Sequence, residues 1–146
     1  MNRIKITLPT SFIFSTEVRV RVGDVNYAGH LGNDRVLSLL HEARVRFLNA
    51  HGYAELDVEG QGTIMVDAAV IYKAEAFAGE RLKIELAVDD FHRYGCVVYY
   101  RVTRAEDKKE ICRARTGLAF FDYGERKLAP VPEKFRELCV GLAQAH

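Results

Sequence analysis

Hydrophobic and polar residues alternate along the first part of the chain and then adopt a different spacing. Over residues 12–22, FIFSTEVRVRV, the alternation has a period of two, which predicts a strand with one buried face. Over residues 36–48 apolar side chains recur at spacings of three and four, which predicts a helix of about 17 residues. We expect Asn33 or Asp34 to cap the start of this helix and Gly52 to end it.

The rest of the chain returns to the period of two. Alternation predicts strands over residues 63–70 and 82–88, and two more over 96–104 and 110–122. We expect short turns to join these four strands as antiparallel hairpins, and a short amphipathic helix to follow at the C-terminus. The pattern therefore predicts an α+β fold, in which a five-stranded antiparallel sheet covers the apolar face of one long helix.

Composition limits the partners and the compartment. A length of 146 residues without linker or repeat fits a single domain over 1–146. Lys and Arg number 21 against 20 Asp and Glu, with no long run of one sign, so we expect no nucleic-acid partner. There is no signal-peptide pattern and no apolar stretch of the roughly 20 residues that cross a membrane, so we expect no membrane partner. Three cysteines without metal-ligand spacing indicate reduced thiols in the cytoplasm and no metal site.

The segment GDVNYAGHLGND, residues 23–34, joins the first strand to the helix and concentrates glycine and polar residues. Unpaired N–H groups at a helix N-terminus favour a bound anion or a developing negative charge. Gly29 and Gly32 are expected to let the backbone turn sharply and let a substrate approach it. His30 is a candidate general base because imidazole exchanges protons near neutral pH, although such a histidine often only braces a turn. This junction, residues 23–34, is the predicted functional site.

Four stretches of the sequence carry a resemblance to a known family. They are the strand VRVRVGDVN, the turn YAGHLGND, the helix VLSLLHEARVRFL and the strand AAVIYKAEAFAGERLKIEL. Over residues 12–123 the chain resembles hotdog-fold thioesterases of the 4-hydroxybenzoyl-CoA thioesterase type. The resemblance implies the hotdog fold and hydrolysis of an acyl-CoA or another acyl thioester at a site shared between two subunits. It implies no metal and no cofactor.

The resemblance also assigns roles within the junction. The family carries two aspartates there, and the second is its catalytic carboxylate; here Asp24 matches the first, but Asn26 occupies the second position. An amide neither attacks a thioester nor takes a proton, so Asn26 can only orient water or donate a hydrogen bond. The family's oxyanion donor corresponds to the backbone N–H of Asn33, and Tyr27 is a candidate wall of the acyl pocket.

Three residues are candidate bases in place of the missing carboxylate. Asp24, on a segment expected to be extended, would point to the same face as Asn26, or else serve as a structural carboxylate of the turn. His30 is the second candidate. Glu42 lies two turns into the helix, and its alternative role is a surface ion pair with Arg46 at i,i+4.

Two further points stay open at this stage. Exposed sheet edges and a shared site predict a homodimer or homotetramer. A strip of arginines on the last two strands could bind the nucleotide end of CoA or simply be the exposed face of the sheet: Arg101, Arg104, Arg113 and Arg115. The leading prediction is an acyl-CoA thioesterase, and the alternative is a non-catalytic protein that binds acyl thioesters.

Overall fold

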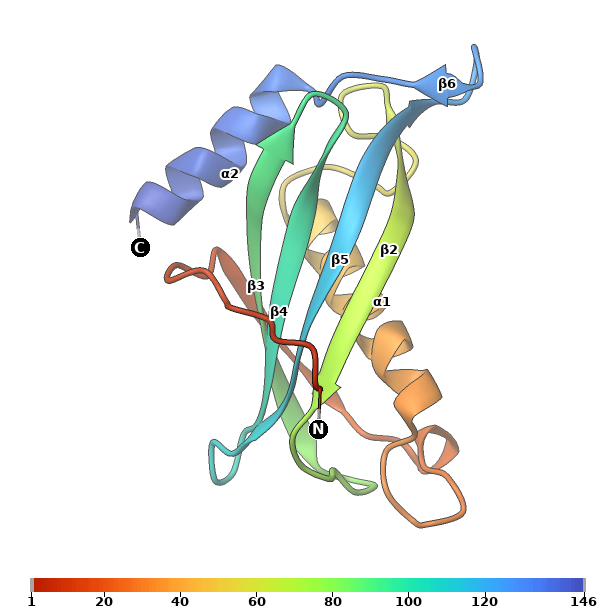
Figure 1. The fold of residues 1–146 in the computed structure, drawn as a ribbon, viewed down its shortest axis with the longest axis vertical. Coiled ribbons are helices and arrows are strands. Elements are labelled where there is room, and N and C mark those ends of the chain that lie inside the picture. Colours follow the sequence, from red (N-terminus) through yellow and green to blue (C-terminus); the bar gives the residue numbers. More distant parts are fainter. Residues whose placement is uncertain (1, 146) are drawn as a thin grey trace.

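The computed structural model describes residues 2–145 as an antiparallel sheet with two helices (Figure 1). Helix α1 runs along the sheet, and α2 lies near the upper end of β3. The elements in chain order are β1 (Phe14–Arg19), a 3-10 turn η1 (Val22–Asp24), α1 (Asn33–Ala50), β2 (Gly62–Tyr72), β3 (Arg81–His92), β4 (Gly95–Arg104), β5 (Glu110–Asp122), β6 (Lys127–Leu128) and α2 (Glu133–Ala145).

The sheet has the strand order β1-β3-β4-β5-β2, and the two-residue β6 pairs with β5. The predicted α+β fold, a sheet around one long helix followed by a short C-terminal helix, is confirmed, with β6 as a sixth strand. The expected run of hairpins is wrong at β2, which pairs with β5 and not with β3. Residues 73–80 instead cross the end of the sheet, and the junction satisfies their backbone: Leu31 N donates to Ala76 O at 2.7 Å.

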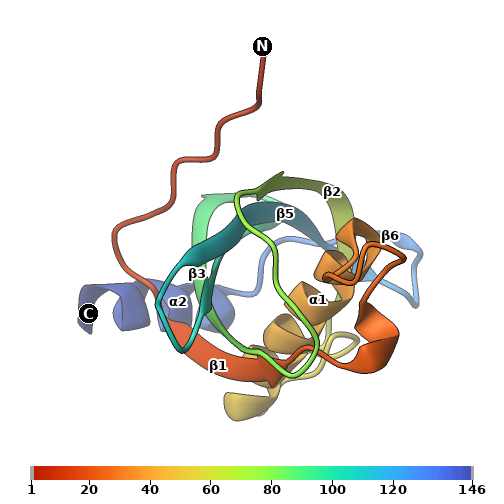
Figure 2. The same cartoon turned by 90° about the horizontal axis from the view of Figure 1, so that it is seen from below.

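Helix α1 lies on the inner side of the curved sheet (Figure 2). Its apolar face is 4% exposed or less at five positions: Val36, Leu40, Ala43, Phe47 and Leu48. Burying one large aliphatic side chain of this kind contributes about 1.5–3 kcal/mol. The apolar stripe read from the sequence therefore holds α1 against the sheet.

One charged side chain, Arg44, is buried on this same face of α1. Its guanidinium donates to the hydroxyl of Tyr100 at 3.1 Å and lies 3.5 Å from the carboxylate of Glu55. The Tyr100 hydroxyl in turn shares a 2.8 Å hydrogen bond with Thr116, and His41 Nε2 lies 2.6 Å from Glu55. A buried charge is stable only when it is paired and hydrogen-bonded, and this network supplies both.

Both ends of the junction differ from the prediction. Strand β1 stops at Arg19, and the 3-10 turn that follows contains Asp24, so Asp24 is not on an extended segment facing Asn26. Helix α1 begins after Gly32, with Asn33 already helical, and no side chain among residues 2–145 caps this end. The expected cap by Asn33 or Asp34 is therefore wrong. Gly52, with φ +78°, follows the last turn as expected for a glycine that ends a helix.

The two ends of the chain cover different parts of the sheet. Residues 2–13, here called the N-terminal arm, run over its outer side, opposite α1, and bury Ile6 (Figure 2). Helix α2 packs through Phe135, whose ring contacts those of Tyr53, Phe91 and Phe120. The three cysteines, all within residues 2–145, are buried and free, and burial raises the pKa of the Cys96 and Cys112 thiols to about 12.

Two kinds of feature are absent from residues 2–145. Neither helix within residues 2–145 combines the length and the hydropathy needed to cross a membrane. Across the same residues, no group of three or more His, Cys, Asp or Glu side chains is placed to hold a metal ion.

Candidate active site

The junction folds into a compact loop closed by its own backbone. Asn26 N donates to His30 O and Gly29 N donates to Asn26 O, both at 2.9 Å, and Val25 pairs with Leu31 as an isolated bridge. Gly29 has φ +83°, a conformation that strains residues with a side chain. Glycine is therefore required at position 29, and the loop delivers His30 to the start of α1.

The start of α1 presents backbone donors without a side-chain cap. Gly32 N donates to Asp24 O at 2.9 Å, and Arg35 N donates to Gly32 O at 3.0 Å. Gly32 itself has an ordinary φ of −70°, and a Cβ there would lie 2.5 Å from a carboxylate oxygen of Asp34, so a side chain at this position would require Asp34 to move. The first N–H groups of a helix have no partner within it, and the helix dipole makes this end positive. The N–H of Asn33 is thus suited to receive a developing oxyanion.

A cavity of about 270 Å³ opens beside these donors. Four segments form it: the end of the junction, the first turn of α1, the end of β2 with the residues that follow it, and the start of β5. The lining residues are His30, Leu31, Asn33, Val36, Tyr72, Lys73, Ala74, Glu75, Ala76, Ile111 and Cys112. Of the predicted site residues, the cavity brings together His30 and Asn33. Its walls are otherwise mostly apolar, which suits the acyl part of a substrate.

His30 has the geometry of a base that two neighbours orient. Its Nδ1 lies 3.1 Å from the carbonyl oxygen of Leu31. Because a carbonyl oxygen can only accept, this contact assigns the proton of the neutral ring to Nδ1 and leaves Nε2 with a free lone pair. Nε2 lies 3.8 Å from the carboxylate of Glu75. The side chain is 24% exposed, so water reaches it.

Residues after β2 contribute groups that the sequence did not indicate. The Tyr72 hydroxyl donates to the carbonyl oxygen of Asn33 at 3.1 Å, which fixes the end of β2 against the helix start. Lys73 and Glu75 follow it along the cavity wall. Their signal in the sequence is weak because the segment reaches the junction only when β2 pairs with β5 and residues 73–80 cross the sheet end.

Asp24, the first candidate base, is a structural carboxylate. It is 2% exposed and accepts hydrogen bonds from the backbone N–H of Arg21 at 2.9 Å and from its guanidinium at 3.1 and 3.2 Å. The hydrogen bond from the Arg21 side chain is the largest cause that lowers the pKa of Asp24 below its ordinary value. A carboxylate held ionised in this way is a poor proton acceptor, and it lies outside the cavity.

Glu42, Asn26 and Tyr27 also lie outside the cavity. Glu42 is 3.3 Å from the guanidinium of Arg46, the i,i+4 ion pair given above as its alternative role. Asn26 is exposed, and its Oδ1 accepts a 2.9 Å hydrogen bond from Ala28 N, so its NH₂ group is the end that can still donate. Tyr27 is fully exposed, at 112%, and does not line the cavity of this subunit.

Comparisons with known proteins agree with this architecture. The model of the thioesterase-like superfamily matches residues 20–138. A 1,4-dihydroxy-2-naphthoyl-CoA hydrolase of Synechocystis is 27% identical over 128 residues, which cover 84% of this chain and 91% of that protein. The crystal structure of a 1,4-dihydroxy-2-naphthoyl-CoA thioesterase from Synechocystis has a TM-score of 0.79 at 25% identity, covering 87% of this chain and 95% of the other.

The fold also matches a mutant 4-hydroxybenzoyl-CoA thioesterase complexed with 4-hydroxybenzoyl-CoA. That structure has a TM-score of 0.76 at 24% identity and covers 86% of this chain and 97% of its own. These matches confirm the resemblance to hotdog-fold thioesterases. Because the family model covers most of its length, this chain belongs to the thioesterase-like superfamily.

Proposed function

We propose that this protein is an acyl-CoA thioesterase that hydrolyses its substrate in the cavity between the junction and the end of β2. One observation carries the proposal: His30, whose Nδ1 lies on the Leu31 carbonyl oxygen, and Asn33 at the uncapped start of α1 line the same cavity. A base and an oxyanion donor beside one apolar cavity are what addition of water to a thioester requires. Membership in the thioesterase-like superfamily supports the same reaction.

The reaction follows from these groups. The thioester carbonyl oxygen accepts a hydrogen bond from Asn33 N–H, and His30 Nε2 takes a proton from a water molecule as that water attacks the carbonyl carbon. Glu75 stabilises the imidazolium that forms. The tetrahedral intermediate then collapses to the carboxylic acid, and the departing CoA thiolate receives the proton from His30. Asn26 serves as a donor that orients water or substrate at the mouth of the junction, since its amide exchanges no proton.

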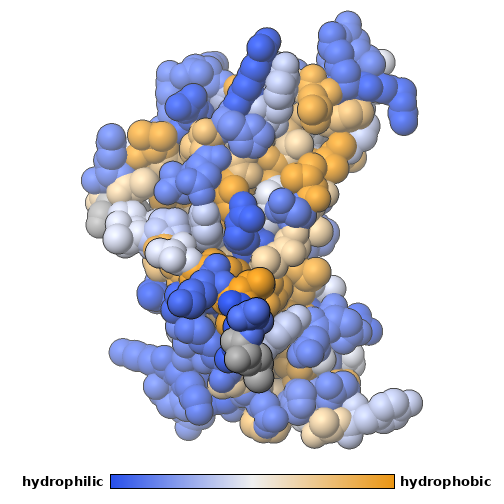
Figure 3. Space-filling view, in the orientation of Figure 1, coloured by the Kyte–Doolittle hydropathy of each residue, from blue (hydrophilic) through white to orange (hydrophobic). Residues whose placement is uncertain are grey.

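The proposal includes a homodimer formed along β2. Among the described residues β2 pairs with β5 on one side, and its other edge carries Met65 and Val66, which are 45% and 61% exposed. Hydrophobic side chains show over this part of the sheet in Figure 3. An exposed apolar edge strand is a template for a second strand, and pairing two β2 edges covers it. Light scattering at micromolar protein concentration should give a dimeric or tetrameric mass. A monomeric mass contradicts the proposed dimer.

The substrate class is an acyl or aromatic acyl thioester, handled in the cytoplasm by a single-domain subunit. The relative from Synechocystis, named for 1,4-dihydroxy-2-naphthoyl-CoA, supports an aromatic acyl group, and the buried free cysteines support a reducing compartment. The test incubates purified protein with acetyl-, palmitoyl-, benzoyl- and 1,4-dihydroxy-2-naphthoyl-CoA and measures released thiol with a thiol-reactive dye. Release with at least one ester is expected. If no thiol is released from any of these esters at several pH values, the hydrolase is contradicted and the alternative, a non-catalytic thioester-binding protein, is favoured.

A further inference from the structure

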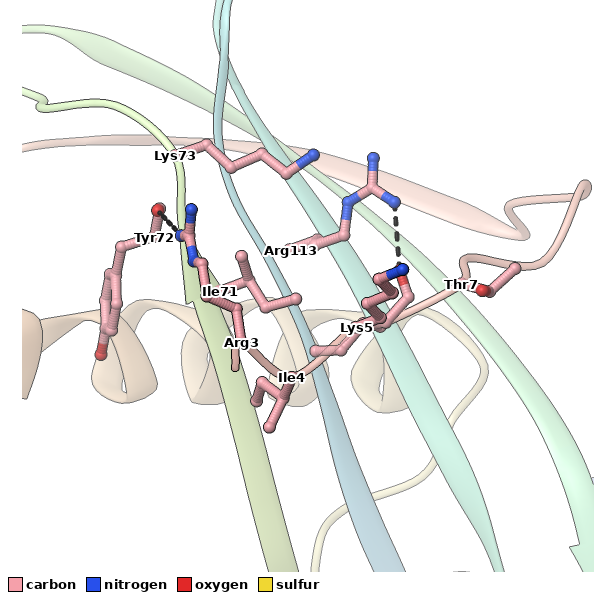
Figure 4. A pocket seen from close by; sticks show the side chains of 9 residues that line it. Arg3, Ile4, Lys5, Thr7, Ile71, Tyr72, Lys73 and Arg113 are labelled. Carbon is pink, nitrogen blue, oxygen red and sulfur yellow. Dashed lines mark hydrogen bonds between the residues drawn. The ribbon is translucent and has the colours of Figure 1, made fainter. Parts of the chain in front are cut away.

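A second cavity, of about 540 Å³, lies on the outer face of the sheet beneath the N-terminal arm. The arm and the end of β2 form its walls, and Figure 4 shows their side chains. Arg3 on the arm donates to the carbonyl oxygen of Tyr72 at 3.3 Å, and Arg113 on β5 donates to that of Ile6 at 3.1 Å. These two bonds, with Ile6 buried, hold the arm over the sheet. The arm precedes the residues that the family model matches, 20–138.

This outer cavity is strongly basic. Four cationic side chains line it: Arg3, Lys5, Lys73 and Arg113. One carboxylate, Glu110, lies nearby, 2.8 Å from Arg113 and 3.6 Å from Lys73. Hydrogen bonds from Arg113 lower the pKa of Glu110, so it is ionised and offsets one of the four cations. The remaining positive charge suits a ligand with more than one phosphate.

The outer cavity adjoins the proposed active site. Tyr72 and Lys73 line both cavities. The Tyr72 hydroxyl lies at the start of α1, whereas its carbonyl oxygen is held by Arg3 in the outer cavity. Lys73 is therefore placed to contact a ligand that extends from one cavity to the other.

Of the arginine strip considered from the sequence, Arg113 lines the outer cavity, whereas Arg101 and Arg104 do not. Arg101 lies 2.9 Å from Glu85, and Arg104 lies 3.0 Å from Glu80 and 2.9 Å from Asp107. Carboxylates thus neutralise these two arginines in place. Arg3 and Lys5, in contrast, are exposed on the arm, and the polar contact recorded for Arg3 is with a neutral carbonyl.

We infer that the outer cavity binds the phosphorylated nucleotide end of CoA, with Arg3 and Lys5 of the N-terminal arm and Lys73 contacting its phosphates. This inference rests on the proposed thioesterase function. The exposed Ile4 and Tyr72 side chains and the half-buried Ile71 of the same cavity offer apolar surface to the adenosine. A phosphopantetheine group on a carrier protein has no nucleotide to fill this cavity, so the protein selects CoA esters.

The kinetic test compares two esters of the same acyl group, benzoyl-CoA and benzoyl-pantetheine. The double variant Arg3→Gln/Lys5→Gln removes two cations without shortening the arm. The matched control is Arg126→Gln/Lys134→Gln, two exposed cations near β6 and α2. Wild type and control should have a KM for benzoyl-CoA at least about tenfold below that for benzoyl-pantetheine, and the arm variant should lose most of this ratio. Equal KM values in wild type, or the same ratio in the arm variant, overturn the inference.

A binding test does not depend on catalysis. Adenosine 3′,5′-bisphosphate is titrated into each protein by calorimetry at two salt concentrations. Wild type and control should bind it, more weakly at high salt, and the arm variant should bind about tenfold more weakly than wild type. No binding to wild type, or equal binding to the arm variant, overturns the inference. If wild type binds the bisphosphate but hydrolyses neither ester, the nucleotide site stands and the proposed hydrolase is contradicted.

Discussion

Replacing His30 by glutamine tests the proposed base most directly. Glutamine has a similar reach and its NH₂ can still donate to the carbonyl oxygen of Leu31, as Nδ1 does at 3.1 Å in the wild type. It has no nitrogen that can take a proton from water at neutral pH. The variant therefore keeps the packing of the junction and removes only the proton transfer. We expect His30→Gln to fold normally and to hydrolyse its best acyl-CoA far more slowly.

The expected fall in kcat follows from the proposed role of His30 as a general base. A positioned general base contributes about 10²–10⁴-fold to a rate, so kcat should fall by that factor while KM changes little. Glu75 provides a graded comparison, because its carboxylate lies 3.8 Å from Nε2 and its side chain is 62% exposed. Coulomb's law at this distance in a water-like dielectric gives about 1 kcal/mol, or about sixfold in rate. Glu75→Gln should therefore lower kcat about sixfold.

Four measurements separate a lost base from a damaged fold. Circular dichroism and thermal unfolding should match the wild type in both variants. The pH profile of kcat/KM should show a single-proton inflection in wild type that His30→Gln lacks. In His30→Ala, added imidazole should restore part of the rate. Full activity of His30→Gln refutes the proposed mechanism, as does an unchanged pH profile or a Glu75→Gln variant that is slower than His30→Gln.

Three further predictions concern the fold and the junction. Asp24→Asn should lower the free energy of unfolding by about 1–2 kcal/mol at pH 7, measured by denaturant titration. Because the fold lowers the pKa of Asp24, this difference from wild type should shrink as the pH falls below the ordinary value of 3.8. A difference that does not change with pH contradicts the role of Asp24 as an ionised structural carboxylate. Phe135→Ala should cost about 3–5 kcal/mol, because its buried ring joins α2 to the sheet, and a loss under about 1 kcal/mol refutes that packing. Asn26→Asp should move the pH optimum of hydrolysis upward, because a nearby negative charge holds the His30 proton more tightly; an unmoved optimum counts against His30 as the base.

The hydrophobic periodicity of the sequence was sufficient to predict the helices and strands that bury one face. The spacing of Val36, Leu40 and Phe47 predicts α1, and these residues are 4% exposed or less. Alternation over residues 82–88 predicts β3, where Leu82, Ile84 and Leu86 are fully buried. Both patterns are local, because a helix or strand against a core shows its period within one segment. This is why the fold class could be predicted from the sequence.

Pairing between distant segments could not be predicted in the same way. Alternation in β2 shows a strand but does not say whether β3 or β5 is its neighbour, since the period is the same for either. The position of Asp24 could not be predicted from alternation either. The alternating pattern continues in the sequence to Val22, but in the structure a 3-10 turn interrupts it and buries Asp24. Arg44 gave no signal as a buried charge, because its partners Tyr100 and Glu55 lie in other segments.

The pairing of β2 with β5 also decides what stands in for the family's carboxylate. With Asn26 at that position, the junction holds His30 as the proposed proton acceptor, and its buried carboxylate, Asp24, is paired with Arg21, so Asp24 does not supply a negative charge beside His30. The crossing segment 73–80 supplies that charge as Glu75, and the 2.7 Å hydrogen bond from Leu31 N to Ala76 O keeps it beside the imidazole. Under the proposed mechanism, the base and its carboxylate thus come from segments about 45 residues apart and meet only in the folded sheet. Under that mechanism, a motif search confined to the junction misses Glu75, because the residue is brought to His30 only by the fold.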